Sequence, residues 1–455
     1  MEMTTAQVAA AIPGALMVEI VGDASTAVVD LTHDSRQVAP GWAFAAVRGE
    51  RADGHRFAST AVASGASLLI VDHRLEFDVA QIVVRDVRIA LGHAAAAVHG
   101  RPSDRLRMVG ITGTNGKTTT THLLASILRT SGMEARELGT LSGVRTTPEA
   151  PDLQRRLAGF VADGVDAVVM EVSSHALALH RVTGTRFDAV AFTNLGRDHL
   201  DLHESMEAYF RAKASLFTPE LATMGVTNVD DPYGRLLLDV AAIPVGGFSI
   251  GDASDVEVDV GHHEFTWRGR RVHVPIGGGF NVMNSLAALT VAERLGVDLD
   301  VAVAGLRATG SIPGRFELVS TGADDISVIV DYAHTPDGLV ELLESARRVA
   351  GSGRVIVVFG CGGDRDADKR PLMGAAAATH ADLVVVTSDN PRHEDPEAII
   401  RSAVAGIEQR YRESVMTDVD RRTAIDRAIH LARPGDVVLV AGKGHEVTQT
   451  IGDQA

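Results

Sequence analysis

Short apolar runs alternate with longer alanine-rich or amphipathic stretches along most of this chain. In one such unit the run MVGIT leads into the segment GTNGKTTT and then into the amphipathic stretch THLLASILRTSG. This order predicts a strand, a glycine-rich loop and a helix. Near the C-terminus, ISVIVDY, RVIVVFG, ADLVVVTSD and DVVLVAG also alternate with helical segments. Such alternation is typical of a parallel sheet with helices on both faces, so we predict an α/β protein.

The length of 455 residues suggests about three domains. We place their bounds at 1–98, 99–315 and 316–455, with a linker near residues 99–107. The first range predicts a small α/β domain, and the second contains the strand–loop–helix unit. The third contains the four apolar runs of the predicted parallel sheet.

Composition excludes several classes of protein. The formal net charge of −16 argues against a nucleic-acid binder, which normally carries a basic surface. No apolar run approaches the roughly 20 residues that span a bilayer, and the N-terminus lacks the basic start of a signal peptide. The single cysteine, Cys361, rules out an internal disulfide framework. We therefore expect a cytoplasmic protein without membrane insertion or a nucleic-acid partner.

The segment GTNGKTTT has the chemistry of a phosphate-binding loop. Its glycines allow backbone amides to approach phosphate, and the following helix N-terminus adds partial positive charge. Lys117 can reach the β- and γ-phosphates, and the Thr118 hydroxyl can bind Mg²⁺. The segment departs from a strict Walker motif, because Ile111 occupies the place of its first glycine. Such a loop by itself does not distinguish a kinase, a GTPase switch or a ligase.

The chain is poor in lysine. Lys and Arg total 43, yet only four are lysines, namely Lys117, Lys213, Lys369 and Lys443. A genome biased toward arginine codons explains the total but not the positions. Only lysine offers a compact ammonium or a readily deprotonated amine. We therefore expect the four lysines at places where arginine cannot serve, without assigning individual roles to Lys369 and Lys443.

Ten segments follow one another in a characteristic order: GTNGKTTT, MEVSSHAL, FTNLGRDHLDLH, YFRAK, FNVMNSLAAL, PGRFE, DYAHTPDGL, GCGGDRDADKRPLM, SDNPRHEDP and AGKGHE. Together they closely resemble the muramyl ligase family over nearly the whole chain. The N-terminal THDSRQVAPGWAFAAVRGERADGHRF also resembles the nucleotide-sugar-binding domain of that family. The resemblance implies three α/β domains: an N-terminal nucleotide-sugar-binding domain, a central P-loop ATPase and a C-terminal Rossmann-like domain for the amino acid.

The resemblance also implies an ATP and Mg²⁺ site where the domains meet. The ATP-binding residues would be Gly113, Thr114, Asn115, Gly116, Lys117, Thr118, Thr119, Asn281, Asn284, Arg315, Asp331 and His334. The catalytic residues would be Lys117, Glu171, His199 and Lys213, and the metal ligands Thr118, Glu171, His199 and Lys213. In the family the lysine at position 213 is carbamylated by CO₂, which turns a cation into an anionic ligand. The structural alternatives are helix caps for Glu171 and Asn281, a surface His199, a solvated Lys213 and ordinary loop contacts for Arg315, Asp331 and His334.

Substrate positions follow from the same resemblance. Ser35 matches a uridine-binding position, and the muramoyl-peptide side is matched by Thr146, Thr147, Ser173 and Arg181. Arg145 stands where the family commonly has asparagine. The amino-acid site would comprise Arg365, Asp389, Asn390, Pro391, Arg392, Gly442 and Glu446. In members that add meso-diaminopimelate, the arginine of the DNPR segment grips the distal carboxylate, and Glu446 could bind the distal ammonium. The structural alternative for DNPR is a strand-to-helix turn.

The resemblance implies an ATP-dependent ligase. It would add meso-diaminopimelate to the UDP-linked muramoyl dipeptide through an acyl phosphate, in peptidoglycan precursor synthesis. Arg145 keeps open a related ligase recruited to specialised metabolism, and a related ligase that uses L-lysine is a further alternative. A folate polyglutamate-adding enzyme would lack the DSR and DNPR segments, and a non-catalytic switch would have no need of Lys117, Glu171, His199 and Lys213. The sequence leaves the oligomeric state open.

Overall fold

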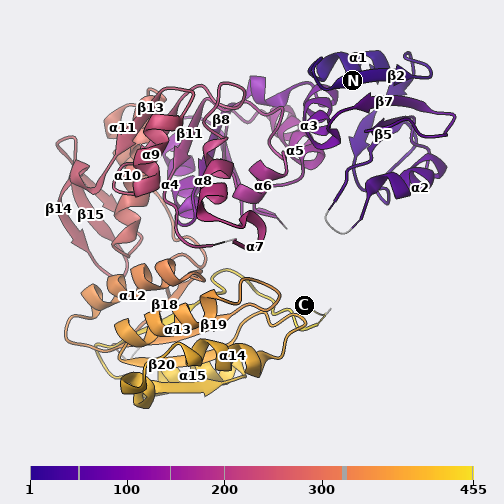
Figure 1. The fold of residues 1–455 in the computed structure, drawn as a ribbon. Coiled ribbons are helices and arrows are strands. Elements are labelled where there is room, and N and C mark those ends of the chain that lie inside the picture. The colour runs from indigo at the N-terminus through magenta and orange to yellow at the C-terminus, as the bar shows by residue number, and fades with distance from the viewer. Residues whose placement is uncertain are drawn as a thin grey trace.

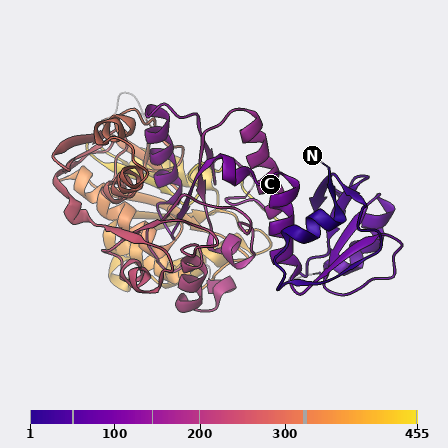
Figure 2. The same cartoon turned by 90° about the horizontal axis from the view of Figure 1, so that it is seen from above.

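The structure is a computed structural model that describes residues 2–49, 52–143, 145–198, 200–319, 325–452 and 454, with the side chains of residues 200 and 201 excepted. Three α/β domains follow one another along the chain (Figure 1). Seen from above, the N-terminal domain projects from one side of the other two (Figure 2). The α/β prediction is confirmed, whereas the bounds at residues 98 and 315 stay a prediction. No described helix is long and apolar enough to cross a membrane.

The N-terminal domain has a five-stranded sheet in the order β2-β7-β6-β5-β4, in which only β2 is antiparallel to its neighbour. Its strands are β2 (Met17–Val21), β4 (Asp30–Thr32), β5 (Trp42–Ala45), β6 (Leu68–Val71) and β7 (Ala80–Val84). Helices α1 (Thr5–Ala11) and α3 (Val87–Val98) cover one face, and η1 (Gly54–Phe57) leads into α2 (Ala58–Ala63). A small pair of strands, β1 (Met3–Thr4) and β3 (Ala27–Val28), lies beside α1.

The linker predicted near residues 99–107 is packed rather than open. It contains η2 (Pro102–Arg105), in which Pro102 and Ser103 are buried. The Ser103 hydroxyl accepts a hydrogen bond from the Arg186 amide at 3.2 Å. The connection between the two domains is therefore fixed by contacts with the central domain.

The central domain is built on six parallel strands in the order β13-β12-β11-β8-β10-β9. The strands are β8 (Arg107–Thr112), β9 (Ala135–Leu138), β10 (Ala167–Glu171), β11 (Ala189–Phe192), β12 (Gly225–Asn228) and β13 (Val245–Phe248). Strand β8 is a switch point of the sheet: β10 and β9 lie on one side of it, and β11, β12 and β13 lie on the other. In open sheets of this kind, ligands bind outside the carboxyl ends of the strands at such a switch point.

Helices cover both faces of this sheet. Helices α4 (Lys117–Thr130), α10 (Phe280–Arg294) and α11 (Leu299–Arg307) form the core of one face. The other helices are α5 (Ala150–Ala162), α6 (Ser174–Ala178), α7 (Leu200–His203), α8 (Met206–Ala214) and α9 (Pro232–Val240). After η3 (Ile250–Asp252), the strands β14 (Ala253–Val258), β15 (His263–Trp267) and β16 (Arg270–Val274) form an antiparallel sheet. This sheet adds apolar side chains to the core formed by α4, α10 and α11. This small sheet was not predicted from the sequence.

The C-terminal domain has six strands in the order β17-β18-β22-β19-β20-β21. They are β17 (Glu317–Val319), β18 (Ser327–Asp331), β19 (Val355–Cys361), β20 (Leu383–Ser388), β21 (Val415–Asp418) and β22 (Val437–Ala441). The predicted parallel pairing of the four apolar runs is confirmed, and β17 adds an antiparallel edge. The helices are α12 (Pro336–Ala350), α13 (Lys369–His380), α14 (Pro396–Ala405), η4 (Gln409–Ser414) and α15 (Arg421–Leu431). Helix α12 faces the central domain (Figure 1).

Candidate functional site

The loop between β8 and α4 requires glycine at two positions. Gly113 and Gly116 have φ angles of +152° and +83°. A Cβ atom at Gly113 would lie 1.8 Å from the Thr193 hydroxyl oxygen, and one at Gly116 would lie 2.2 Å from Asn284 Oδ1. The segment after β11 holds the loop, since the Asn115 amide donates to the side chain of Asn194 at 2.8 Å. The predicted strand, loop and helix are confirmed.

A cleft of about 630 Å³ opens at this loop, between the central and C-terminal domains. It brings together fourteen of the residues predicted from the sequence: Thr114, Asn115, Gly116, Lys117, Thr118, Thr119, Thr146, Glu171, Ser173, Lys213, Asn284, Arg315, Asp331 and His334. These residues come from segments more than 200 positions apart in the chain, from Thr114 to His334. The volume and the polar lining suit a nucleotide.

Two lysines donate to the same carbonyl oxygen. Nζ of Lys117 lies 3.0 Å and Nζ of Lys213 lies 2.7 Å from the oxygen of Gly113. Burial lowers the pKa of Lys117, and burial together with the charge of Lys117 holds the pKa of Lys213 well below its usual value. Lys213 is 1% exposed and its amine lies 4.6 Å from the centre of the Tyr209 ring. A solvated helix lysine, the structural alternative, is therefore excluded.

Oxygen atoms gather beside the loop. Glu171 is the last residue of β10 and is 1% exposed, so it is not a helix cap. Its carboxylate accepts hydrogen bonds from the Thr118 hydroxyl at 3.0 Å and from the Thr140 amide at 2.8 Å. A carboxylate and a hydroxyl are hard oxygen ligands of the kind that Mg²⁺ prefers, so these residues fit a magnesium ion.

An arginine at the boundary between the central and C-terminal domains reaches the same place. The Arg315 guanidinium donates to the Thr118 hydroxyl at 3.0 Å and stacks 4.4 Å from the centre of the Tyr332 ring. Asp331 ends β18, and its two carboxylate oxygens accept hydrogen bonds from the amides of Phe316 and Ala333, each at 2.7 Å. Burial raises the pKa of Asp331. The carboxylate is thereby oriented by the backbone that leads into the cleft.

Sequence reasoning missed a charged contact across the cleft. The carboxylate of Asp198 lies 3.6 Å from the amine of Lys369 and 3.5 Å from Nε2 of His334. The Arg197 amide also donates to Asp337 at the start of α12, at 3.2 Å. Asp198 and Lys369 belong to segments that carried the family resemblance, which was the only signal for them. His199 lies outside the described residues, so its role stays a prediction.

Asn281 and Asn284 lie on one side of α10, as predicted. The Asn284 amide donates to Asn281 Oδ1 at 2.8 Å, and the Asn281 amide donates to the Gly277 carbonyl at 2.7 Å. Asn284 lines the cleft, whereas Asn281 lies behind it. The helix N-cap is Gly279, so the capping alternative for Asn281 is wrong.

The residues matched to the muramoyl-peptide side lie next to Glu171. The Thr147 hydroxyl donates to the Glu171 carbonyl at 2.8 Å and accepts from the Ser173 amide at 3.1 Å. Arg181 pairs with the buried carboxylate of Glu149 at 2.8 Å, and Arg145 pairs with the same carboxylate at 2.5 Å. Thr146 and Ser173 line the cleft, whereas Thr147 and Arg181 do not.

A second cavity of about 400 Å³ lies between the N-terminal and central domains. It is lined by His33, Asp34, Gln37, Arg145, Pro148, Glu149, Asp152 and Arg156. Ser35 is half-buried and follows directly after the lining residue Asp34. The predicted uridine position therefore lies at the edge of this cavity rather than at the 630 Å³ cleft.

The residues predicted for the amino acid form a separate group in the C-terminal domain. The Asn390 amide donates to the Glu446 carboxylate at 2.8 Å. The amine of Lys443 lies 3.1 Å from Asn390 Oδ1, 3.0 Å from Glu446 and 3.7 Å from Asp389. Beneath them, Arg421 donates to the Ala441 carbonyl at 2.9 Å, and burial lowers its pKa. Lys443 and Arg421 were given no role from the sequence.

Two arginines border this group. Arg392 has a φ angle of +51°, and its guanidinium donates to the Gly363 carbonyl at 2.6 Å. Arg365 is exposed, and its side chain, like that of Arg392, lies close to Gly362. Pro391 is buried, and a Cβ atom at Gly442 would lie 2.7 Å from Asp389 Oδ2. The DNPR segment is thus a turn after β20, as its structural alternative predicted, and its binding role stays a prediction.

A phosphate-binding loop at the switch point of a parallel sheet, enclosed by a second α/β domain, defines an α/β nucleotide-binding protein. Family models match most of the chain: "Mur ligase family, catalytic domain" at residues 28–103, "Mur ligase middle domain" at 111–292 and "Mur ligase, glutamate ligase domain" at 314–444. The chain therefore belongs to the Mur ligase family of ATP-dependent, amide-bond-forming ligases, as predicted.

Individual proteins with similar sequences or structures support this membership. The UDP-N-acetylmuramoyl-L-alanyl-D-glutamate–2,6-diaminopimelate ligase of Gloeobacter violaceus is 46% identical over 448 residues, 93% of this chain and 90% of the relative. The protein of the same name from Syntrophomonas wolfei is 42% identical over 447 residues, 93% of this chain and 91% of the relative. A solved structure of a ligase of that name has a TM-score of 0.70 and 32% identity, and covers 100% of this chain and 96% of its own.

Proposed function

We propose that the protein joins meso-diaminopimelate to UDP-N-acetylmuramoyl-L-alanyl-D-glutamate, with ATP as the phosphoryl donor, in peptidoglycan precursor synthesis. The observation that carries the proposal is the group of Asn390, Lys443 and Glu446 beside Arg392. A diamino acid with two carboxylates needs cationic side chains for its carboxylates and an anionic side chain for its ammonium groups. ATP is a cytoplasmic metabolite, so we place the reaction in the cytoplasm. The proposed domains 1–98, 99–315 and 316–455 would bind the nucleotide sugar, ATP and the amino acid.

In the first step, an oxygen of the D-glutamate γ-carboxylate bonds to the γ-phosphorus of ATP, and ADP leaves with the electrons of the broken P–O bond. The Lys117 ammonium and the amides of the loop neutralise the phosphate charge. Phosphate oxygens favour the charged form of Lys117, whose pKa burial otherwise lowers. We expect Lys117 to turn from the Gly113 carbonyl to the nucleotide when ATP binds.

In the second step, the amine of the amino acid attacks the acyl carbon, and the tetrahedral intermediate releases inorganic phosphate and leaves an amide. Water would hydrolyse the acyl phosphate, so the cleft must close around it. The contacts of Asp198 with Lys369 and His334 join the two domains across the cleft. We propose that they stabilise the closed arrangement.

The proposed Mg²⁺ ligands are Thr118, Glu171, His199 and a carbamate on Lys213. When bound, Mg²⁺ neutralises the phosphate oxygens of ATP and the charge that develops during transfer. Carbamylation needs a neutral amine, which attacks the carbon of CO₂ and releases a proton. The buried Lys213, with its lowered pKa, offers such an amine, whereas arginine stays protonated.

For the acceptor, we propose that Arg392 and Arg365 bind the distal carboxylate of meso-diaminopimelate and that Glu446 binds the distal ammonium. Asp389, Asn390, Pro391 and Gly442 would shape this site. For the other substrate, we propose that Ser35 contacts the uridine, and that Thr146, Thr147, Ser173 and Arg181 contact the muramoyl-peptide part. ATP would contact residues 113–119 together with Asn281, Asn284, Arg315, Asp331 and His334.

A panel of amino acids measured with the UDP-linked dipeptide and ATP tests the proposed function. Phosphate release and the mass of the nucleotide product should both report addition of meso-diaminopimelate, with L-lysine used far less well. Product formation with L-lysine alone would overturn the choice of acceptor. Phosphate release without any amide product would overturn the assignment of the second substrate.

A further inference from the structure

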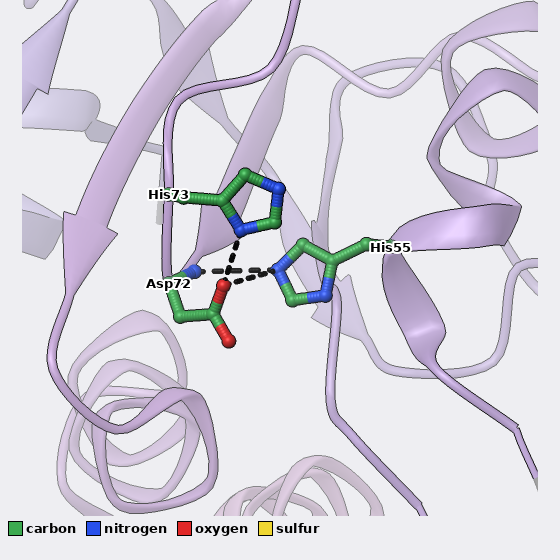
Figure 3. Close-up of side chains that lie close together, drawn as sticks. All are labelled: His55, Asp72 and His73. Atoms are coloured by element: carbon green, nitrogen blue, oxygen red, sulfur yellow. Dashed lines mark hydrogen bonds and ion pairs between the residues drawn. The ribbon is translucent and has the colours of Figure 1, made fainter.

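Two imidazoles and one carboxylate converge in the N-terminal domain (Figure 3). One potential metal-ligating atom from each of His55, Asp72 and His73 lies within 4.8 Å of the other two. None of these three residues lines the cleft or the second cavity. The group is therefore separate from the residues proposed for ligation, and it requires its own explanation.

The fold brings the three residues to the carboxyl end of β6, the middle strand of the N-terminal sheet. Asp72 and His73 directly follow β6, a strand whose four residues are all buried. His55 belongs to η1, a short helix capped by the Asp53 carboxylate. The end of a buried strand is a rigid position, so Asp72 is presented to His55 by the sheet itself.

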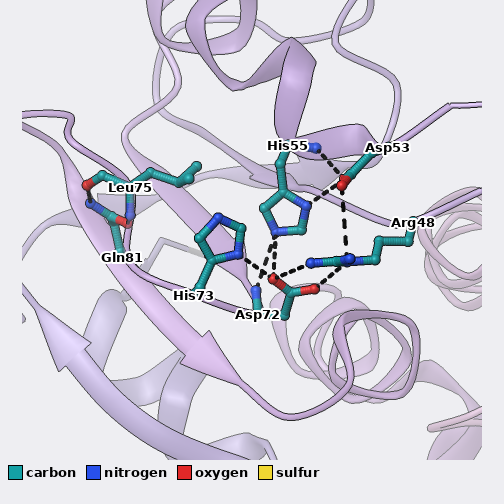
Figure 4. A network of polar contacts seen from close by, with 7 residues as sticks. All are labelled: Arg48, Asp53, His55, Asp72, His73, Leu75 and Gln81. Carbon is teal, nitrogen blue, oxygen red and sulfur yellow. Dashed lines mark hydrogen bonds and ion pairs between the residues drawn. The ribbon is translucent and has the colours of Figure 1, made fainter.

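The imidazole of His55 is oriented by a second carboxylate (Figure 4). Its Nδ1 lies 2.6 Å from Oδ1 of Asp53, which accepts the Nδ1 proton. Nε2 therefore carries the lone pair, accepts a hydrogen bond from the Asp72 amide at 3.3 Å and lies 3.2 Å from Asp72 Oδ1. The side chain is only 7% exposed. A carboxylate behind an imidazole in this way is the usual support of a metal-binding histidine.

The Asp72 carboxylate is held in place by an arginine. Arg48 donates through Nε to Asp72 Oδ2 at 2.6 Å and through Nη2 to Oδ1 at 3.2 Å. The Arg48 side chain is 62% exposed, so it can withdraw from Oδ1 without loss of core packing. Oδ1 is the oxygen that faces both imidazoles.

His73 completes the group from the solvent side. Its Nδ1 lies 2.5 Å from Asp72 Oδ1, and its ring stacks on that of His55 with centroids 4.7 Å apart. The His73 side chain is 55% exposed, so water can reach the space between the three ligand atoms. The arrangement has protein ligands on one side and open positions on the other.

We propose that His55, Asp72 and His73 bind one divalent transition-metal ion of the zinc class, with water in the remaining positions. Two imidazoles and one carboxylate suit such an ion, whereas Mg²⁺ prefers oxygen ligands alone. On binding, the neutral His73 ring carries its proton on Nε2 and offers the lone pair of Nδ1, so a protonated ring releases one proton to solvent. The ion replaces the contacts of Asp72 Oδ1 with the two rings. The bound ion links η1 to the end of β6.

The test titrates the metal-free full-length protein with Zn²⁺ by calorimetry, in excess Mg²⁺ so that oxygen-ligand sites are filled. We expect one Zn²⁺ per chain, bound more weakly in acid, where protons compete with the ion for the imidazole nitrogens. His73→Ala and Asp72→Asn should each weaken binding by roughly tenfold or more. His430→Ala, at an exposed histidine outside the group, should bind as the wild type does.

The thermal unfolding temperature of each variant, measured without metal, distinguishes loss of a metal ligand from loss of the folded structure. His73 is exposed, so His73→Ala should unfold at the wild-type temperature and serves as the deciding variant. Asp53→Asn tests the positioning of His55, and should weaken Zn²⁺ binding about tenfold while Co²⁺ still gives the visible absorption of a histidine-bound ion. Absence of Zn²⁺ binding, or equal affinity in the wild type and His73→Ala, would overturn the proposal. Neither result depends on ligase activity.

Discussion

At the scale of single residues, the Gly113 carbonyl is shared by the amines of Lys117 and Lys213. Two ammonium groups on one oxygen repel each other, and burial removes the water that would screen them. Lys213 is the one whose pKa is held furthest down, while Lys117 lies beside the helix N-terminus that attracts phosphate. Burial therefore favours the neutral amine most strongly at Lys213, whereas anionic phosphate would favour the charged form of Lys117. Arginine could not fill the first of these roles.

The first prediction concerns Lys213→Ala. We expect a folded protein that loses roughly 100-fold or more in ligase rate, because an anionic ligand of the proposed metal is missing. Short carboxylic acids should partly restore the rate, and ¹³CO₂ should give a carbamate resonance in the wild type alone. A wild type without that resonance, together with near-normal turnover of the variant, would contradict carbamylation.

The second prediction concerns Arg392→Ala. Loss of one partner of a desolvated charge pair costs about 2–5 kcal/mol, so catalytic efficiency with meso-diaminopimelate should fall roughly 30-fold or more. L-lysine has no distal carboxylate and should be affected far less. The measured quantity is the ratio of efficiencies for the two amino acids. Arg401→Ala, in an exposed ion pair on α14, is the control, and an unchanged ratio in Arg392→Ala would mean that Arg392 does not read that carboxylate.

At the scale of elements, the loop between β8 and α4 is shaped by helix α10. Gly116 is the N-cap of α4 and lies against the Asn284 side chain, which Asn281 holds in turn. The position of the first α4 residues therefore depends on a helix more than 150 residues later in the sequence. Local sequence preferences alone do not produce this geometry.

The third prediction compares Gly116→Ala with Gly132→Ala at the two ends of α4. Both glycines have positive φ angles, +83° and +92°, so both variants should lose about 1–2 kcal/mol of stability through backbone strain. Only Gly116 faces a clash, whereas a Cβ atom at Gly132 meets nothing within 4 Å. Gly116→Ala should therefore lose roughly 100-fold in efficiency for ATP, because small displacements at a reacting group have effects of that size. Equal ATP kinetics in the two variants would contradict the role of the loop.

At the scale of the whole molecule, half-buried charges join the N-terminal and central domains. Arg155 on α5 donates two hydrogen bonds to the Asp30 carboxylate, at 3.0 and 3.1 Å, and its guanidinium lies 5.3 Å from the centre of the Trp42 ring. His99 Nε2 lies 3.2 Å from the same carboxylate. Although burial raises the pKa of Asp30, the nearby His99 imidazole and the hydrogen bonds from Arg155 hold that pKa below its usual range. These contacts fix the N-terminal domain on the central one.

The fourth prediction concerns Arg155→Ala. The variant should lose about 1–2 kcal/mol of stability, since a charged hydrogen-bonded pair is broken at a partly exposed site. The KM for the nucleotide-sugar substrate should rise more than that for ATP. Because the pKa of Asp30 is lowered, its contribution is complete above the unfolded value of about 3.9 and is lost as the pH falls further. Thermal unfolding against pH checks this, and an acid response equal to that of the wild type would contradict it.

The sequence by itself determined the α/β class, the strand–loop–helix unit and the membership of the family. These features rest on local apolar periodicity and on ordered motifs, both of which are readable without long-range contacts. The scarcity of lysine also marked Lys117 and Lys213, which the structure then placed on one carbonyl. The DNPR turn was likewise readable from its proline and its position after an apolar run.

Only the tertiary structure decided which charges meet. Lys213 is buried because α8 packs it against the loop after β8, a contact across 100 positions of sequence. Asp198 and Lys369, Arg155 and Asp30, and His55 and Asp72 are likewise partners from separate elements. The antiparallel edge strand β17 and the sheet of β14–β16 also escaped prediction. Side-chain periodicity reports which face of an element is apolar, but the partner of a buried charge depends on how the elements pack, because desolvation and Coulomb energy are set by distances in space.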